Sequence, residues 1–397
     1  MSLKKIIATL TNYFLIVFVF LTVLPVKLNY SSIVVFVLVG LSFIKLFCFK
    51  DNALVVTKYY LLIISTPLIV YFFGLINTLN MDYGYNFLAK NLSFIAFPFI
   101  FFAIGKHVQI RNVYKAYLIG LCLTDLFLMY LFFYNYNFGT KFYMIVTIDI
   151  YHATYLGMYN LFAFWICINY WLKKREYLLS FGALFFVVSA VMTSSRTIFI
   201  LAFFSLIITF FMIFNSGVKR IVSLILILIV GVLAVASIPS IQQKFDQFSE
   251  ISKLEFDNDN YQSISSRFGK IVAAVSVISD NLWIGTGTGD IKDVLVEKYQ
   301  EMRFVMGYKY RYNPHNQFLD NLARNGLIGG GICILSIYCF PMLIGIRQKN
   351  LLLVSLILIC FGVSLTESIL DIHKGITFYV FFVSLNMNRI IQKNLNS

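Results

Sequence analysis

The sequence predicts an all-α, polytopic integral membrane protein with about twelve transmembrane helices and one long, partly helical loop on the non-cytoplasmic side. The 397 residues are 59% hydrophobic and only 13% charged, and their mean hydropathy is +0.81. Apolar stretches of roughly 20 residues, enough to cross about 30 Å of hydrocarbon, follow one another along the chain. Lys and Arg gather in alternate connections between these stretches, which is the pattern of cytoplasmic loops.

Each apolar run is expected to form a helix. Because the runs are continuous, they exclude a lipid-facing barrel, whose strands would alternate apolar and polar residues over about 10 positions. The expected helices lie at about Ile6–Leu24, Ser31–Phe49, Tyr59–Asn77, Phe87–Gly105, Val113–Tyr134, Ile150–Leu172, Tyr177–Thr193, Thr197–Asn215, Ile221–Ile238, Gln317–Ile346, Leu351–Glu367 and Gly375–Met387.

The distribution of basic residues predicts how the chain crosses the membrane. One set of connections is rich in Lys and Arg and is expected to be cytoplasmic, together with both termini. The short connections of the other set contain only Lys27, Lys90, Lys141, Arg196 and Lys374. The long segment before the tenth helix lies on that second, outer side. The expected organisation is therefore nine helices in 1–238, a large outer loop with an amphipathic helix in 239–315, and three helices with a cytoplasmic tail in 316–397.

Composition and motifs exclude several classes of function. The net charge of +14 does not indicate nucleic-acid binding, because the basic residues are spread thinly over short loops. All six cysteines fall in expected helices without zinc spacing, so we expect no disulfide framework, no metal site and no cofactor. The glycine-rich stretch Trp283–Asp290 lacks a preceding strand and a Lys-Ser/Thr pair, so a tight turn is expected there instead of a nucleotide site.

Polar and charged residues form four clusters, all on the outer side, where a charge at the membrane is usually functional. The first is Thr193–Thr197, which places Arg196 at the outer boundary. Arg196 either binds an anion at the start of the next helix or extends to lipid phosphate. The second is Ser265–Lys270, where Arg267 is expected to start an amphipathic helix over Ile271–Ile278 that lies on the membrane. The alternative for Arg267 is a solvated surface side chain.

The third cluster is Tyr310–Asp320, in which His315 and Asn316 are expected to start a helix. Its aromatic, amide and hydroxyl groups suit a sugar, which offers apolar faces and many hydroxyls, although a lone histidine at an interface is more often structural. The fourth cluster contains Glu367, which either orients a cation or only neutralises one. His152 lies near the outer end of its helix and either lines the same cavity or packs structurally.

Three motifs carry a family resemblance in their order and spacing. Ser194–Thr197 before a span, Ser266–Arg267 in the outer loop, and His315–Leu319 with Gly326–Gly329 resemble the O-antigen ligase and O-antigen polymerase superfamily. The resemblance covers roughly residues 151–382. It implies a GT-C-like protein of the bacterial inner membrane, in contact with membrane lipid, with a periplasmic loop and a periplasmic active site. Trp283–Asp290 is similar to the glycine-rich loop segment of that family.

The resemblance also implies a reaction. Such proteins transfer a glycan from undecaprenyl diphosphate to an acceptor, which is lipid A-core or another lipid-linked glycan. Arg196 and Arg267 are then expected to hold the diphosphate without a metal, while His315 accepts the proton of the attacking hydroxyl, with inversion at the anomeric carbon. The residues expected to bind substrate around them are Arg311, Asn316, Tyr310, Glu367 and His152.

Alternatives remain open at this stage. A ligase passes the polysaccharide to lipid A-core, whereas a polymerase joins lipid-linked repeat units, and both need the same donor site. The loop and His-Asn motifs favour the ligase. A transporter or flippase for lipid-linked glycans would place polar groups near the middle of the membrane and show internal repeats. The sequence has few charges in the middle of its expected helices and no convincing repeat between its halves.

Overall fold

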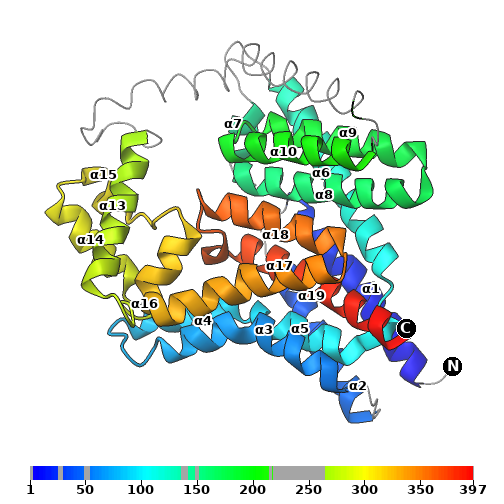
Figure 1. Ribbon diagram of the computed structural model, residues 1–397, viewed down its shortest axis with the longest axis horizontal. Helices are drawn as coiled ribbons and strands as arrows, with labels where there is room; N and C mark the ends of the chain where they lie inside the picture. Colours follow the sequence, from blue (N-terminus) through cyan, green and yellow to red (C-terminus); the bar gives the residue numbers. More distant parts are fainter. Residues whose placement is uncertain are drawn as a thin grey trace. The chain divides into compact units, whose positions relative to one another are not determined.

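The computed structural model describes residues 3–25, 30–48, 54–135, 142–147, 152–213, 217 and 264–396. The expected helix at Ile221–Ile238 and the first part of the outer loop lie outside these residues. The chain divides into two compact units (Figure 1), each described by itself. Unit 1 comprises Met1–Thr22, Leu28–Tyr117 and Glu255–Ser397, and unit 2 comprises Val23–Lys27 and Leu118–Leu254.

Every regular element in the described residues is helical, which confirms the all-α class. The helices are α1 (Leu3–Val23), α2 (Tyr30–Cys48), α3 (Leu54–Phe73), α4 (Met81–Asn91), α5 (Ser93–Ile104), η1 (Gly105–His107), α6 (Ile110–Tyr134), α7 (Phe142–Thr147), α8 (Ala153–Lys174), α9 (Tyr177–Met192), α10 (Arg196–Ile213), α13 (Ile264–Asp280), α14 (Ile291–Glu301), α15 (Val305–Tyr310), α16 (Gln317–Ile334), η2 (Leu335–Cys339), α17 (Phe340–Arg347), α18 (Leu351–Ser364), η3 (Ile369–Asp371) and α19 (His373–Asn396).

Six helical stretches among the described residues are long and apolar enough to cross a membrane. They are Lys5–Val23, Tyr30–Phe47, Met81–Ile104, Ile110–Tyr134, Arg196–Ile213 and Gln317–Arg347. Shorter apolar helices occupy Tyr59–Phe73, Tyr177–Met192 and Leu351–Ser364. The membrane class is thereby supported, whereas the total of about twelve spans and their orientation stay predictions.

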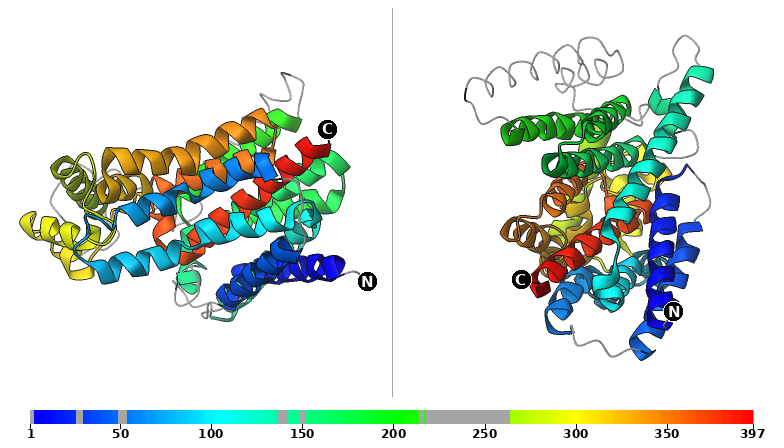
Figure 2. Two further views of the ribbon diagram at one scale, coloured as in Figure 1. Left: turned by 90° about the horizontal axis from the view of Figure 1, so that it is seen from below. Right: turned by 90° about the vertical axis from the view of Figure 1, so that its right-hand side faces the viewer.

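Unit 1 is built around α5, which packs against α2, α3 and α19. Figure 2 shows α19 (red) running beside α5 (cyan). Because α5 is apolar on all sides, it can be buried on most of them, and its Phe94, Phe97 and Ile100 have no exposed surface. At its C-terminal end the Lys45 ammonium donates to the carbonyl oxygens of Ala103 and Ile104, at 2.6 and 2.8 Å, and satisfies groups that a helix end leaves unpaired.

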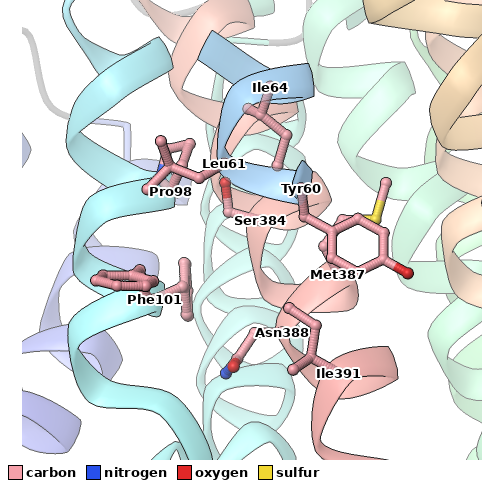
Figure 3. Close-up of a pocket in the computed structure, with 10 residues that line it drawn as sticks. Tyr60, Leu61, Ile64, Pro98, Phe101, Ser384, Met387, Asn388 and Ile391 are labelled. Carbon is pink, nitrogen blue, oxygen red and sulfur yellow. The ribbon is translucent and has the colours of Figure 1, made fainter. Parts of the chain in front are cut away.

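A pocket in unit 1 lies between α3, α5 and the second half of α19 (Figure 3). Its lining is mainly apolar and includes Tyr60, Pro98, Phe101 and Met387, with Ser384 and Asn388 as polar members. Ser384 lies eleven residues after the start of α19 at His373, so the pocket is at least about 16 Å along the helix from that end. It is not part of the polar cluster described below.

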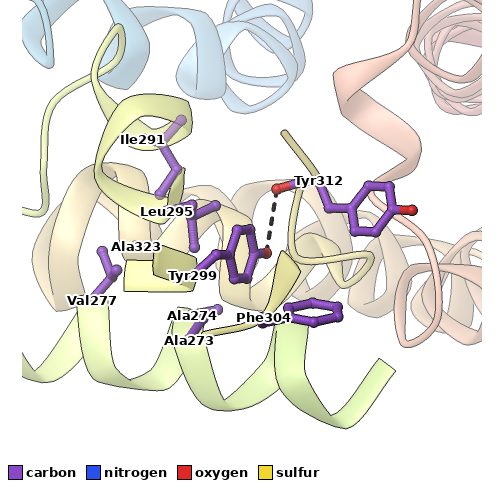
Figure 4. Packing of buried hydrophobic residues seen from close by; sticks show 9 residues of the cluster. All are labelled: Ala273, Ala274, Val277, Ile291, Leu295, Tyr299, Phe304, Tyr312 and Ala323. Atoms are coloured by element: carbon purple, nitrogen blue, oxygen red, sulfur yellow. Dashed lines mark hydrogen bonds between the residues drawn. The ribbon is translucent and has the colours of Figure 1, made fainter. Parts of the chain in front are cut away.

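One part of unit 1 consists of α13, α14 and α15 packed beside the start of α16 (Figure 1). Figure 4 shows its core, in which Ala273 and Val277 of α13 face Leu295 and Tyr299 of α14. The Tyr299 hydroxyl donates to the backbone carbonyl of Tyr312 at 3.3 Å. This core therefore anchors the segment that leads into α16.

The expected tight turn at Trp283–Asp290 is confirmed as a close approach of two backbones. Gly285 and Gly287 have φ angles of 74° and 97°, in the left-handed region that favours glycine. A Cβ atom at Gly285 would lie 2.4 Å from the backbone nitrogen of Gly326. The Thr286 amide donates to the carbonyl of Ala323 at 3.0 Å. The turn is thus docked on α16 at its kink, Gly326, where φ is 65°.

Unit 2 contains α8, α9 and α10, which pack against one another. Gly157 of α8 permits the contact with α10, because a Cβ there would lie 2.7 Å from the Ile198 side chain. Asn160 of α8 donates to a carboxylate oxygen of Asp125 on α6 at 3.1 Å, and both side chains are buried. A second buried contact joins α8 to α10, where the Trp165 indole donates to the Ser205 hydroxyl at 3.2 Å, so close packing and buried hydrogen bonds both hold these helices together.

Candidate active site

His315 lies on the turn between α15 and α16, and its backbone is held on both sides. Its φ angle is 48°, an uncommon value for a residue other than glycine. The His315 amide donates to the Asn313 side-chain oxygen at 3.1 Å. The Asn316 side-chain oxygen accepts from the amides of Phe318 and Leu319, at 2.9 and 3.1 Å, as an N-cap residue does. The expected helix start at His315–Asn316 is confirmed.

Glu367 is the partner of His315. Its Oε2 lies 3.1 Å from His315 Nδ1, and the two side chains are 11% and 27% exposed. When Nδ1–H donates to this carboxylate, Nε2 is left with a lone pair that can accept a proton. The same arrangement of carboxylate and imidazole orients the general base of hydrolytic triads. The sequence left open whether Glu367 orients or neutralises a cation, and the structure places a histidine against it.

Further hydrogen bonds tie the turn to the segment that carries Glu367. The side-chain nitrogen of Asn316 donates to the Leu365 carbonyl at 3.2 Å, and the Gln317 side-chain oxygen accepts from the backbone amide of Leu370 at 2.7 Å. The side-chain nitrogen of Asn313 donates to an Asp371 carboxylate oxygen at 3.1 Å. These contacts join the α15–α16 turn to the segment after α18. The distance between His315 and Glu367 therefore does not depend on their own hydrogen bond alone.

Arg267 and Lys270 add positive charge from α13. The helix begins at Ile264, so the expectation that Arg267 starts it is wrong by three residues, and Arg267 lies within the first turn. Its side chain is exposed, whereas Lys270, one turn later, is only 3% exposed. The Lys270 ammonium lies 4.0 Å from the centroid of the Tyr312 ring, a cation–π distance.

The surroundings of Lys270 change its acidity. Burial and the neighbouring Arg267 lower the pKa of Lys270 to about 8, and the charge of Glu367 opposes this shift. Lys270 therefore interacts electrostatically with both Arg267 and Glu367. Sequence inspection did not single out Lys270, although its spacing of three from Arg267 puts both on neighbouring faces of one helix.

Tyr310 and Arg311 lie at the outer edge of this cluster. The Tyr310 ring is 51% exposed and stacks on Tyr312, with centroids 5.8 Å apart and planes inclined by 10°. The Arg311 guanidinium is 55% exposed and forms an ion pair with Asp293 of α14. An exposed stacked tyrosine can bind a sugar face. Binding of substrate by Tyr310, Arg311 and Asn316 stays a prediction.

A buried arginine links the glycine turn to α16. Arg324 is 1% exposed, donates to the Thr288 carbonyl at 2.7 Å, and pairs with Asp320 at 3.3 Å. Its guanidinium carbon lies 3.8 Å from the centroid of the Phe87 ring. The sequence contained one indication of this network, since Asp320 and Arg324 are four residues apart on one helix. Arg324 stabilises the turn and the beginning of α16 from inside.

In unit 2, Arg196 is the first residue of α10, as expected. The Ser195 carbonyl accepts from the Phe199 amide at 2.9 Å and so opens the helix. The Ser195 hydroxyl lies 3.3 Å from the hydroxyl of Thr154, next to the start of α8. His152 occupies the N-cap position of α8, is exposed, and meets the Tyr155 ring edge-on at 5.8 Å between centroids. Arg196 therefore lies at the start of α10, and His152 lies at the start of α8. The Thr154–Ser195 contact joins these two helix starts.

Residues 181–334 match the family model Wzy_C, described as O-Antigen ligase. This match supports membership of the O-antigen ligase and polymerase superfamily. Members of this family are glycosyltransferase-like enzymes. The matched O-antigen ligase segment includes Arg196, Arg267 and His315, together with the glycine turn, whereas Glu367 and His152 lie beyond its ends. A comparison with curated proteins gave no match.

Proposed function

We propose that the protein transfers a glycan from undecaprenyl diphosphate to an acceptor hydroxyl on the periplasmic face of the bacterial inner membrane. The observation that carries this proposal is the His315–Glu367 pair, at 3.1 Å, beside the cations of α13. A histidine oriented by a carboxylate suits proton transfer, and nearby cations suit an anionic leaving group. The match to the O-antigen ligase family supports a lipid-linked glycan as the donor class.

In the proposed reaction, the acceptor oxygen attacks the anomeric carbon while its proton passes to Nε2 of His315. The bond between the anomeric carbon and the phosphate oxygen breaks, and the lipid diphosphate leaves with the bonding electrons. The Glu367 carboxylate stabilises the imidazolium that forms. Attack on the face opposite the leaving group inverts the configuration of the anomeric carbon.

The arginines are proposed to bind the diphosphate. A guanidinium group keeps its charge at all relevant pH values and binds two phosphate oxygens at once, so it can take the role that a divalent cation has elsewhere. Arg267 suits this task because its side chain is exposed on the first turn of α13. Arg196 is the second proposed ligand, since it begins α10, where unpaired backbone amides also favour an anion.

The acceptor distinguishes the two forms of this function. We favour lipid A-core as acceptor, and thus a ligase, because the matched family is described by that activity. The alternative is a polymerase that joins lipid-linked repeat units. A deletion strain separates them, because a ligase mutant accumulates long chains on the lipid carrier and a polymerase mutant leaves single repeats on lipopolysaccharide.

The direct test uses the purified full-length protein in lipid nanodiscs with an undecaprenyl-diphosphate glycan. Lipid A-core and a second lipid-linked glycan are supplied as acceptors in separate reactions. Covalent transfer without ATP is the expected result and would exclude a flippase. Movement of the intact lipid-linked glycan across a bilayer without transfer to either acceptor would reject the proposal.

A further inference from the structure

We propose that Lys270 is a positioning residue for the His315–Glu367 pair, whose ammonium offsets the charge of Glu367 and so keeps the His315 imidazole neutral at neutral pH. This inference rests on the proposed function, in which His315 accepts a proton. It assigns Lys270 a task distinct from that of Arg267, although both are on α13.

Geometry separates the two cations of α13. Arg267 is exposed and can reach a substrate, whereas Lys270 is 3% exposed and points into unit 1. The Lys270 ammonium lies 4.0 Å from the centroid of the Tyr312 ring. The Tyr312 ring in turn meets the His315 ring edge-on, with centroids 6.4 Å apart. Lys270 is therefore packed against the turn that presents the proposed base.

The position of Tyr312 relative to α13 is itself well determined. Its backbone carbonyl accepts from the Tyr299 hydroxyl, and Tyr299 belongs to the core shared by α13 and α14 (Figure 4). The Tyr312 ring, which lies beneath Lys270, is therefore held in place relative to α13 by Tyr299 and this core. The ammonium is held near the His315 turn and is not an adaptable surface charge.

Charge balance explains why a proposed base needs such a neighbour. A carboxylate 3.1 Å from an imidazole favours the protonated ring, and a protonated ring cannot accept a proton. A nearby ammonium favours the neutral ring. Among the described residues, the charged and titratable groups around Lys270 include Arg267 on α13, Glu367 after α18, and Tyr312 and His315 on the α15–α16 turn.

The acidity of Lys270 agrees with this arrangement. Burial and Arg267 lower the pKa of Lys270 to about 8, so the side chain carries its charge at neutral pH and loses it in mildly alkaline solution. The negative charge of Glu367 opposes this lowering of the Lys270 pKa.

The test compares Lys270→Met, which keeps the length but removes the charge, with Lys270→Arg, which keeps the charge. Lys292→Met is the matched control, because Lys292 of α14 also lies over a tyrosine, 5.1 Å from the Tyr83 ring centroid. The full-length proteins in nanodiscs are assayed for glycan transfer from pH 5.5 to pH 9.5. Both kcat and the KM for the lipid-linked donor are measured.

For Lys270→Met we expect the acidic limb of the kcat profile to move to higher pH by roughly half to one unit. The variant and the original protein should converge above pH 8, and the donor KM should change little. Lys270→Arg and Lys292→Met should keep the original profile. A loss that is equal at every pH would indicate packing alone, and a raised donor KM at every pH would indicate a phosphate ligand; either result overturns the inference.

A second measurement needs no turnover. The chain has four histidines, so the ring carbon resonances of labelled protein can be followed by NMR, with His315→Gln identifying the relevant signal. In Lys270→Met this signal should titrate at higher pH than in the original protein. An unchanged titration refutes the role of Lys270 even if transfer is observed. A shifted titration in a protein that transfers no glycan would instead refute the proposed function.

Discussion

The two units of the molecule differ in how their predicted functional residues are held. In unit 1, His315 is fixed by the hydrogen bond that its amide donates to Asn313, by the helix cap at Asn316 and by Glu367. In unit 2, Arg196 is the first residue of the mainly apolar helix α10, and the neighbouring Ser195 hydroxyl lies 3.3 Å from the Thr154 hydroxyl. The difference matches the chemistry proposed for each, because a base must be oriented to within a hydrogen bond, whereas an anion ligand needs a charge and a helix start.

The comparison also shows two uses of positive charge. Arg267 and Arg196 sit at or near the first turns of their helices. Lys270 and Arg324 are buried and contact the protein itself. In the proposed scheme, the buried cations position other residues and the less buried arginines bind the substrate, so burial is the property that separates the two proposed roles.

The largest effect should come from His315→Gln, which removes the proposed base of unit 1. We expect transfer to fall by about 10² to 10⁴-fold, because the amide cannot accept the proton. Initial rates of glycan transfer in nanodiscs measure this. His107→Gln, a histidine outside the site, should retain transfer. Near-normal rates with His315→Gln would show that the catalytic base is not His315 of unit 1.

Glu367→Gln tests whether the orientation of His315 matters apart from its presence. The amide can still lie beside the imidazole but cannot stabilise its positive charge, so we expect kcat to fall by about 10²-fold with little change in donor KM. Steady-state kinetics distinguish the two constants. A change confined to KM would make Glu367 a substrate ligand instead of the partner of the base.

The arginines of the two units can be compared directly with Arg196→Lys and Arg267→Lys. Each keeps the charge but loses the two-pronged contact, and we expect each to lose about 10 to 100-fold in kcat/KM, equivalent to about 1.5 to 3 kcal/mol. Arg303→Lys, an exposed arginine elsewhere in unit 1, is the control. Normal activity of Arg196→Lys alone would restrict the diphosphate site to residues of unit 1.

Asn316→Ala should have a smaller effect, mainly on stability. It removes the cap that accepts from Phe318 and Leu319, which is expected to cost about 1 kcal/mol. Thermal unfolding in detergent should show a lower Tm, and Asn316→Ser should restore most of it. Loss of transfer without any change in Tm would show that Asn316 binds substrate, as the sequence suggested.

The smallest effect is expected from metal removal. Because guanidinium groups are proposed to neutralise the diphosphate, a chelator such as EDTA should leave the transfer rate unchanged. The control is the same reaction with added Mg²⁺. Transfer that ceases with EDTA and returns with Mg²⁺ would reject the proposal that arginines of the two units bind the diphosphate without a metal.

The amino-acid sequence by itself determined several apolar helices, two helix starts and one turn. Continuous apolar runs predicted the ends of α1, α2, α8 and α9 to within three residues, because hydrophobicity and helix length are local properties of the chain. Arg196 and Asn316 were correctly placed at helix starts for the same reason. The glycines of Trp283–Asp290 predicted a close backbone approach, since glycine permits left-handed φ angles.

Only the tertiary structure decided which of these residues meet. His315 and Glu367 are 52 positions apart, and no local pattern states that the fold brings their side chains to 3.1 Å. The burial of Lys270 and Arg324 likewise depends on Tyr312, Phe87 and Thr288, which come from other elements. Distance, burial and electrostatic coupling arise from packing between distant segments, and these quantities separate a proton acceptor from an ordinary surface histidine.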